Sequence, residues 1–98
     1  MINTIAWNRK AINQFEDAIA YIEADSISNA EKFKLDILNK IDGLIKHPER
    51  YSPDKYKTAN DGSFRAFELH SYRIAYRHKN TEVRIIRVRH VKMNPMNY

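Results

Sequence analysis

The sequence predicts an α+β domain in which an N-terminal strand and an antiparallel helical hairpin precede a three-stranded antiparallel meander. Apolar residues recur at intervals of three and four through the first half of the chain, which is the period of a helix. They alternate with polar residues through the last third, which is the period of a strand. With 98 residues, the chain has room for one core, since domains typically hold about 100 to 150 residues. We therefore expect a single domain over residues 1–98.

The N-terminal part predicts a short strand followed by a helix. Residues 4–7 form an apolar strand candidate. Asn8 can cap the next helix because its side-chain oxygen accepts hydrogen bonds from amides of the first turn. This helix is predicted from residue 9 to about residue 24. Its apolar stripe consists of Ile12, Phe15, Ile19 and Ile22, with Ala11 and Ala18 beside them.

A capping pattern predicts the start of a second helix. Ser28 and Glu31 stand three residues apart, as in a reciprocal N-terminal capping box, and the helix ends before Pro48. Because only a few residues separate the two helices, they should lie antiparallel and bury their stripes on the strands that follow. The second stripe consists of Ala30, Phe33, Ile37, Ile41 and Leu44.

The C-terminal half predicts a loop and three strands. Residues 49–62 show no period and contain Pro53 and the turn sequence Asn60-Asp61-Gly62, which indicates a long loop. Short polar breaks then divide three alternating segments, which is typical of an antiparallel meander. These segments span residues 64–70, 72–78 and 82–91.

The net charge of +5 is unevenly distributed along the chain. Residues 1–49 hold six Lys or Arg against eight Asp or Glu, whereas residues 50–98 hold eleven against four. Such a basic half favours RNA, DNA, the ribosome or an acidic protein segment as a partner. The alternative is that the charge only keeps the protein soluble.

The composition excludes several classes of function. There is no cysteine, which excludes disulfides, thiolate catalysis and cysteine-type zinc sites, and the two glycines leave no glycine-rich phosphate loop. We expect neither a cofactor nor a metal. No apolar stretch approaches the ~18 to 20 residues that span a bilayer, and the N-terminus lacks the pattern of a signal peptide. We therefore expect a cytoplasmic protein without a membrane partner.

Arginines gather on one face of the predicted sheet. If the last two strands turn through residues 79–81, His78 faces Glu82, and Arg73, Arg87 and Arg89 crowd at one end of the face left uncovered by the helices. Like charges repel there unless an anion bridges them, which favours a phosphate-binding surface; outward arginines that only aid solubility are the alternative. This register assigns to the helix side Tyr72, Ile74, Tyr76, Arg84, Ile86 and Val88, and to the other side Arg73, Ala75, Arg77, Val83, Ile85, Arg87 and Arg89.

Candidate catalytic residues follow the last strand. His90, Lys92 and Tyr98 place an imidazole, an ammonium and a phenol after it. Together these groups could supply a base, a charge stabiliser and an acid for attack of a ribose 2′-hydroxyl on its own phosphate. His90 also alternates with Val88 and Ile86, which is the pattern of a core histidine.

Two segments carry a resemblance to a known family. Residues 64–77 read Phe-Arg-Ala-Phe-Glu-Leu-His-Ser-Tyr-Arg-Ile-Ala-Tyr-Arg, and residues 83–90 read Val-Arg-Ile-Ile-Arg-Val-Arg-His. With the start at Trp7 and the helix exit at residues 45–48, the chain resembles the RelE/ParE superfamily of toxins from type II toxin–antitoxin modules. The resemblance covers nearly the whole chain and implies the same order of elements.

The resemblance implies one of two mechanisms. RelE-like members are ribosome-dependent endoribonucleases that cut mRNA, and here Arg73 matches their phosphate-binding arginine, Lys92 a basic position and Tyr98 a C-terminal tyrosine. Two lysines of that class are replaced by Phe64 and Ala66, which favours the second mechanism. ParE-like members are non-catalytic and poison DNA gyrase. The ribonuclease remains the alternative, so whether the protein is an enzyme stays open.

The resemblance also implies partners. A cognate antitoxin is expected to wrap the toxin with a partly disordered acidic segment, and the two can form a higher-order complex. The expected binding residues are Arg73, Arg77, Arg87 and Arg89. The target is DNA gyrase or the translating ribosome with its mRNA. A third hypothesis is a non-toxic nucleic-acid-binding module, for which a basic face alone would suffice.

Overall fold

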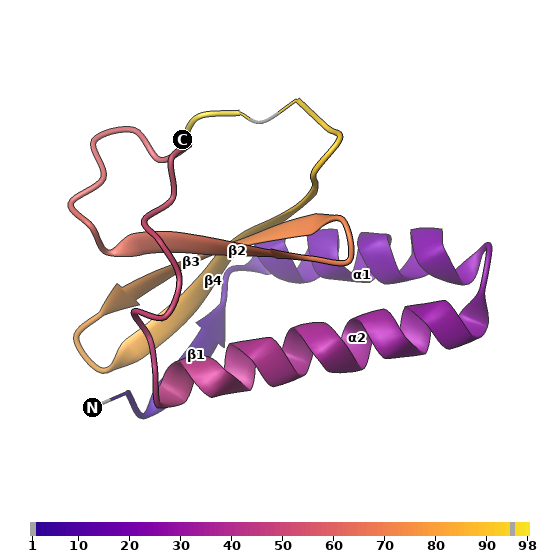
Figure 1. The fold of residues 1–98 in the computed structure, drawn as a ribbon, viewed down its shortest axis with the longest axis horizontal. Helices are drawn as coiled ribbons and strands as arrows, with labels where there is room; N and C mark the ends of the chain where they lie inside the picture. The colour runs from indigo at the N-terminus through magenta and orange to yellow at the C-terminus, as the bar shows by residue number, and fades with distance from the viewer. Residues whose placement is uncertain (1, 95) are drawn as a thin grey trace.

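A mixed sheet carries a helical hairpin on one face in the computed structural model, which describes residues 2–94 and 96–98. The hairpin consists of α1 (Arg9–Glu23) and α2 (Ile27–Asp42), which lie side by side (Figure 1), and the 3₁₀ turn η1 (Gly43–Ile45) continues α2. In these residues the sheet has the order β1-β4-β3-β2. Its strands are β1 (Thr4–Trp7), β2 (Phe64–Leu69), β3 (Tyr72–Lys79) and β4 (Glu82–His90). The predicted α+β class and order of elements are confirmed.

The two helices are capped differently from the prediction. Ser26, and not Ser28, caps α2, because its Oγ accepts a hydrogen bond of 3.2 Å from the amide of Asn29. Asn8 stands at the N-cap of α1, but its Oδ1 accepts a hydrogen bond from Arg84 Nη1 instead of a helix amide. At Asn8 a tertiary contact thus takes up the side-chain oxygen that would otherwise cap the helix.

Strand β1 pairs in parallel with the first part of β4, from Thr4 opposite Glu82 to Trp7 opposite Ile85. Farther along β4, a side chain of α1 takes the place of a strand. The amide of Val88 donates a hydrogen bond of 2.8 Å to Oε1 of Gln14. A backbone donor at the sheet edge is thereby satisfied, and α1 is held against β4.

The turn between β3 and β4 is shorter than predicted. Lys79 pairs with Glu82, so the turn contains Asn80 and Thr81 alone, and Asn80 takes a positive φ of 57°, which asparagine tolerates. The predicted pairing of His78 with Glu82 is therefore wrong, and His78 faces Val83.

A β-bulge at Ile86 then changes the register of the same two strands. Tyr76 pairs with Ile85, but the next residue of β3, Ala75, pairs with Arg87, so Ile86 has no partner on β3. Without the bulge, Ile74 would pair with Arg87, and this arginine would point into the core. Because of the bulge, Ile74 instead pairs with Val88.

The turn and the bulge together correct the predicted faces of β4. Val83 and Ile85 are fully buried in the core, although they were assigned to the outer face. Arg84 and Ile86, which were assigned to the helix side, are only half-buried. The assignments of β3, of Val88 and of the outward arginines Arg73, Arg87 and Arg89 agree with the structure.

The core lies between the hairpin and the sheet. Phe33 of α2 stacks on Phe15 of α1 and Tyr72 of β3, with ring centroids 5.8 and 5.1 Å apart. Tyr76 is fully buried, and its hydroxyl donates a hydrogen bond of 2.7 Å to the carbonyl of Pro48. The stripes predicted for both helices supply most of the remaining apolar surface, with Ile12 more exposed, at 41%, than expected.

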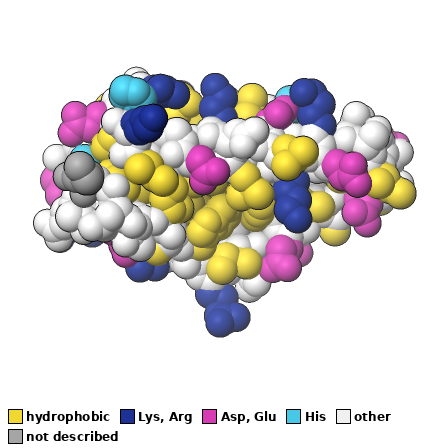
Figure 2. All heavy atoms as spheres, turned by 90° about the horizontal axis from the view of Figure 1, so that it is seen from below, with side chains coloured by type: hydrophobic (Ala, Val, Ile, Leu, Met, Phe, Trp, Pro, Cys, Tyr) yellow, Lys and Arg dark blue, Asp and Glu magenta, His cyan; other side chains and the backbone are white. Residues whose placement is uncertain are grey.

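The face that lies at the bottom of Figure 1 is mixed. Figure 2 shows this face, with hydrophobic side chains across its middle and acidic and basic ones around them. Within the described part of the chain, no helix is long and apolar enough to cross a membrane.

The bulge can be tested by deleting single residues. Deletion of Ile86 should be tolerated, with a loss of about 1–2 kcal/mol in the free energy of unfolding, because it leaves an unbroken alternation and the same pairs on β3. Deletion of Arg77, a half-buried residue of β3, is the matched control. It moves three core side chains to the wrong face, so cooperative urea unfolding should be lost. Equal losses in the two variants would contradict this account of the bulge.

Candidate functional site

The sheet face turned away from the helices is covered, contrary to the prediction. Ala75 alternates with the core residues Ile74 and Tyr76 and so lies on this outer face, yet it is 1% exposed. The long loop supplies the cover. Its Asp54 amide donates a hydrogen bond of 2.8 Å to the carbonyl of Phe64 on the edge strand β2. Backbone groups of an edge strand need partners, and the loop provides them.

The C-terminal residue completes the cover. The Tyr98 amide donates to the carbonyl of Tyr56 at 3.1 Å, and the Thr58 amide donates to the carbonyl of Tyr98 at 2.7 Å. Lys57 Nζ also donates to the Tyr98 carbonyl, at 3.1 Å. The chain end therefore lies against the long loop, as Figure 1 shows.

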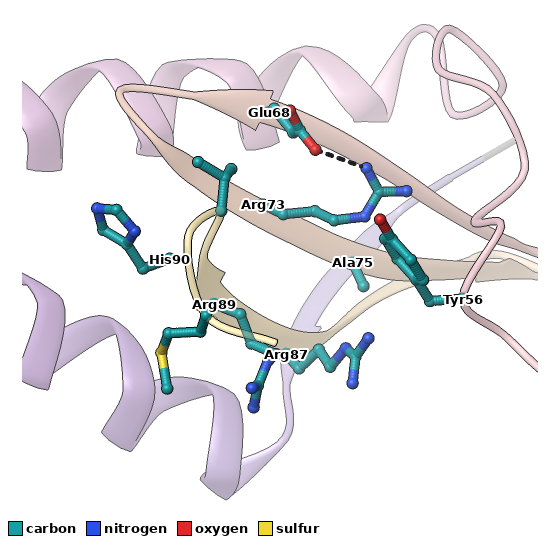
Figure 3. Close-up of a pocket in the computed structure, with 9 residues that line it drawn as sticks. Tyr56, Glu68, Arg73, Ala75, Arg87, Arg89 and His90 are labelled. Atoms are coloured by element: carbon teal, nitrogen blue, oxygen red, sulfur yellow. Dashed lines mark hydrogen bonds and ion pairs between the residues drawn. The ribbon is translucent and has the colours of Figure 1, made fainter. Parts of the chain in front are cut away.

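Three arginines meet on this face, as the spacing predicts. Arg73 of β3 lies opposite Arg89 of β4, and Ala75 lies opposite Arg87. Their side chains line a cavity of about 30 Å³ together with Tyr56 of the loop (Figure 3). The alanine leaves room for the long side chains on either side of it, so the cavity is framed by guanidinium groups.

A buried carboxylate organises the cluster. The side chain of Asp54 is fully buried, and its Oδ1 accepts a hydrogen bond of 2.9 Å from Arg73 Nη2. Its Oδ2 accepts one of 2.6 Å from the hydroxyl of Tyr98. Burial by itself raises the pKa of Asp54, but the hydrogen bonds from Tyr98 and Arg73 outweigh it, so this pKa lies below the ordinary 3.8. Asp54 is thus a buried anion that holds two parts of the site together.

Sequence reasoning missed Asp54 and the second acidic partner, Glu68. Glu68 Oε2 accepts a hydrogen bond of 2.9 Å from Arg73 Nη1, and the Arg73 guanidinium lies over the Tyr56 ring, 5.0 Å from its centroid. A signal was present, because the basic half of the chain holds only four acidic residues. Each of them is a candidate partner for an arginine.

Tyr98 covers Arg87. The Arg87 guanidinium lies 4.1 Å from the centroid of the Tyr98 ring, a cation–π contact. Burial, followed by the hydrogen bond to Asp54, raises the pKa of Tyr98 above its ordinary value of 10. Burial also lowers the pKa of Arg87. The phenol is therefore a protonated donor whose hydrogen is already bound to a carboxylate.

Of the other predicted site residues, His90 lines the cavity with the three arginines, whereas Lys92 and Arg77 do not. His90 Nδ1 accepts a hydrogen bond of 3.1 Å from the amide of Lys92, and its ring meets Tyr72 edge-on at 4.9 Å. Lys92 is exposed and lines an adjoining groove, of about 570 Å³, with Tyr72 and Tyr21. Arg77 lies at the far end of β3, where its Nε donates to Ser63 Oγ at 3.1 Å. The structure thus brings together Arg73, Arg87, Arg89, His90 and Tyr98, but not Lys92 or Arg77.

The match to a protein-family model shows which family the chain belongs to. The model of the ParE toxin of the type II toxin–antitoxin system, parDE, matches residues 5–95. The chain belongs to this family. The ParE chain also resembles a solved structure titled "Chromosomal ParDE TA system from P. aeruginosa", with a TM-score of 0.71 and 20% sequence identity. This match covers 94% of the ParE chain and 98% of the other, and it supports the fold. No curated protein matches by sequence.

The role of Asp54 in this ParE chain can be measured by unfolding. Asp54→Asn preserves the shape but leaves the largely buried Arg73 without its buried charged partner and with only the more exposed Glu68, so we expect a loss of about 2–3 kcal/mol in the free energy of unfolding. Glu68→Gln is the matched control: its side chain is 53% exposed, so the loss should stay below about 1 kcal/mol. Similar small losses would show that Asp54 does not organise the cluster.

The same carboxylate should make stability depend on pH. Because the pKa of Asp54 is lowered in the folded protein, its stabilisation is complete above the ordinary pKa of 3.8 and is lost as the pH falls through the folded value. Urea unfolding between pH 7 and pH 2 measures this. The curve for Asp54→Asn should fall less steeply below pH 4 than that of the unaltered protein. Parallel curves would contradict a lowered pKa.

Proposed function

We propose that this ParE-family protein arrests growth by binding and inhibiting DNA gyrase, and that a cognate antitoxin neutralises it. The observation that carries the proposal is the hydrogen bonding of Asp54. The side chains that match the charge stabiliser and the acid of a ribonuclease, Arg73 and Tyr98, both donate to this one buried carboxylate. These two hydrogen bonds hold the long loop and Tyr98 against the sheet.

The remaining parts of a ribonuclease site are only partly assembled. Lys92 lines the adjoining groove and not the cavity. His90 lines the cavity, but its Nδ1 already accepts a hydrogen bond from a backbone amide. The two positions on β2 that carry lysines in RelE-like enzymes hold Phe64, whose ring lies under Lys57 and Arg77, and Ala66, which is buried. A phosphorane-stabilising site needs preorganised cations at the reacting phosphate. This arrangement favours a protein target over mRNA.

The charge distribution supports an acidic antitoxin. The C-terminal half holds eleven Lys or Arg against four Asp or Glu. Two of these four, Asp54 and Glu68, already pair with Arg73. An acidic, partly disordered segment would therefore meet uncompensated arginines on this face and could close the toxin off from gyrase. Such complexes can grow into larger toxin–antitoxin assemblies in the cytoplasm, where gyrase acts.

The proposal is tested by two assays on one preparation of protein. Gyrase-catalysed supercoiling of relaxed plasmid should be inhibited, whereas primer extension on mRNA from a translation extract should show no new breaks. Ribosome-dependent breaks with unaffected gyrase would overturn the proposal in favour of the ribonuclease. Salt-sensitive RNA binding without either effect would indicate the non-toxic module.

Tyr98→Phe sharpens the same test. It keeps the ring on Arg87 and removes the proton that a general acid would donate. Gyrase inhibition should stay within about threefold, whereas a ribonuclease that used this acid would lose roughly a hundredfold in rate. Tyr21→Phe, which alters an exposed tyrosine of α1, is the control.

A further inference from the structure

The guanidinium groups around the 30 Å³ cavity have unused hydrogen-bond donors. The Nε atoms of Arg73 and Arg89 are buried and have no acceptor among the described residues. Arg89 donates through Nη2 to the carbonyl of Asn94 at 2.9 Å. A buried N–H group without an acceptor is unfavourable. Because these two atoms expose almost no surface, a ligand in the cavity would meet the outer nitrogens of the guanidinium groups.

The charge at the cavity is positive by one unit. Arg73 is compensated by Asp54 and Glu68. Within the described part of the chain, Arg87 and Arg89 form no ion pair with a carboxylate. Three guanidinium charges against two carboxylate charges leave one positive charge. A monoanion would neutralise it.

The lining of the cavity selects the kind of anion. A carboxylate carries a single negative charge, and its two oxygens pair with the planar fork of arginine. Glu68 also lines the cavity and disfavours a doubly charged group.

We propose that this cavity is a binding site for the carboxylate of an acidic side chain on a partner protein. Arg87 and Arg89 supply the charge, and the Arg87 guanidinium, which lies against the Tyr98 ring, offers its hydrogen-bond donors to the carboxylate oxygens. The cavity shares Arg89, His90 and Met93 with the groove between α1 and β4, which gives the backbone of such a segment a path. The inference rests on the proposed function in one respect, namely that the working contacts of this face are to proteins.

The site is tested by NMR on the isolated protein, with acetate as the probe. The side-chain N–H signals of Arg87 and Arg89 should shift in a saturable manner with sodium acetate, but not with sodium chloride at equal ionic strength. Inorganic phosphate should bind more weakly than acetate. Absence of a saturable shift, or tighter binding of phosphate, would overturn the proposal.

Single-residue variants distinguish binding at a defined site from a general effect of positive charge. Arg87→Gln should weaken acetate binding by about fivefold to tenfold, and Arg87→Lys, which keeps the charge but loses the fork, should weaken it too. Arg9→Gln, at an exposed position of α1, removes the same charge and should change it less than twofold. Equal weakening by Arg9→Gln and Arg87→Gln would refute a defined site.

A pair of labelled peptides tests whether the bound carboxylate belongs to a protein segment. A twelve-residue peptide of alternating Leu and Glu should bind at least tenfold more tightly than its Leu and Gln counterpart, and Arg87→Gln should abolish the difference. An oligouridine RNA that binds more tightly than the acidic peptide in an Arg87-dependent manner would contradict a protein partner. Neither gyrase nor mRNA is present in these titrations, so failure of the site and failure of the gyrase proposal are separate results.

Discussion

The β-bulge at Ile86 is the constraint on which both the core and the site depend. Upstream of it, Val83 and Ile85 enter the core, and downstream of it Val88 does so. A β-strand alternates strictly, so these apolar side chains can share one face only if the strand gains one residue between them. The same extra residue turns Arg87 and its neighbours outward. Packing of the core thereby determines where the arginines lie.

A buried carboxylate then converts the arginine surface into a defined arrangement. Asp54 lies in a loop without regular structure, but it is held by backbone pairing of that loop with β2 and by donors from Arg73 and Tyr98. A buried ion pair is weak evidence of added stability, because desolvation opposes the attraction. It is stronger evidence of specificity, since one carboxylate can satisfy Arg73 and Tyr98 together in only one placement of loop and chain end.

The sequence predicts the elements well because their signals are local. Helical stripes and strand alternation depend on neighbours in the chain, so every helix and strand was placed to within a few residues. The bulge also has a local signal, since the alternation changes phase at Ile85 and Ile86, but a regular register does not accommodate it. The covered outer face has no local signal beyond the scarcity of carboxylates in the basic half: Asp54 meets Arg73 across 19 positions and Tyr98 across 44. Contacts between residues this far apart in the sequence form only when the loop is folded against the sheet.

The distribution of hydrogen bonds explains how one fold can serve different mechanisms. In this chain Asp54 accepts hydrogen bonds from Arg73 and Tyr98, so their donors stabilise the folded surface and are withheld from a substrate phosphate. Arg87 and Arg89 have no acidic partner in the described residues, so they are free to receive an anion from outside. A catalytic site needs donors that are unsatisfied until the transition state forms. A docking site needs donors that a partner satisfies permanently, and the carboxylate proposed for the cavity would supply acceptors to the arginines of β4.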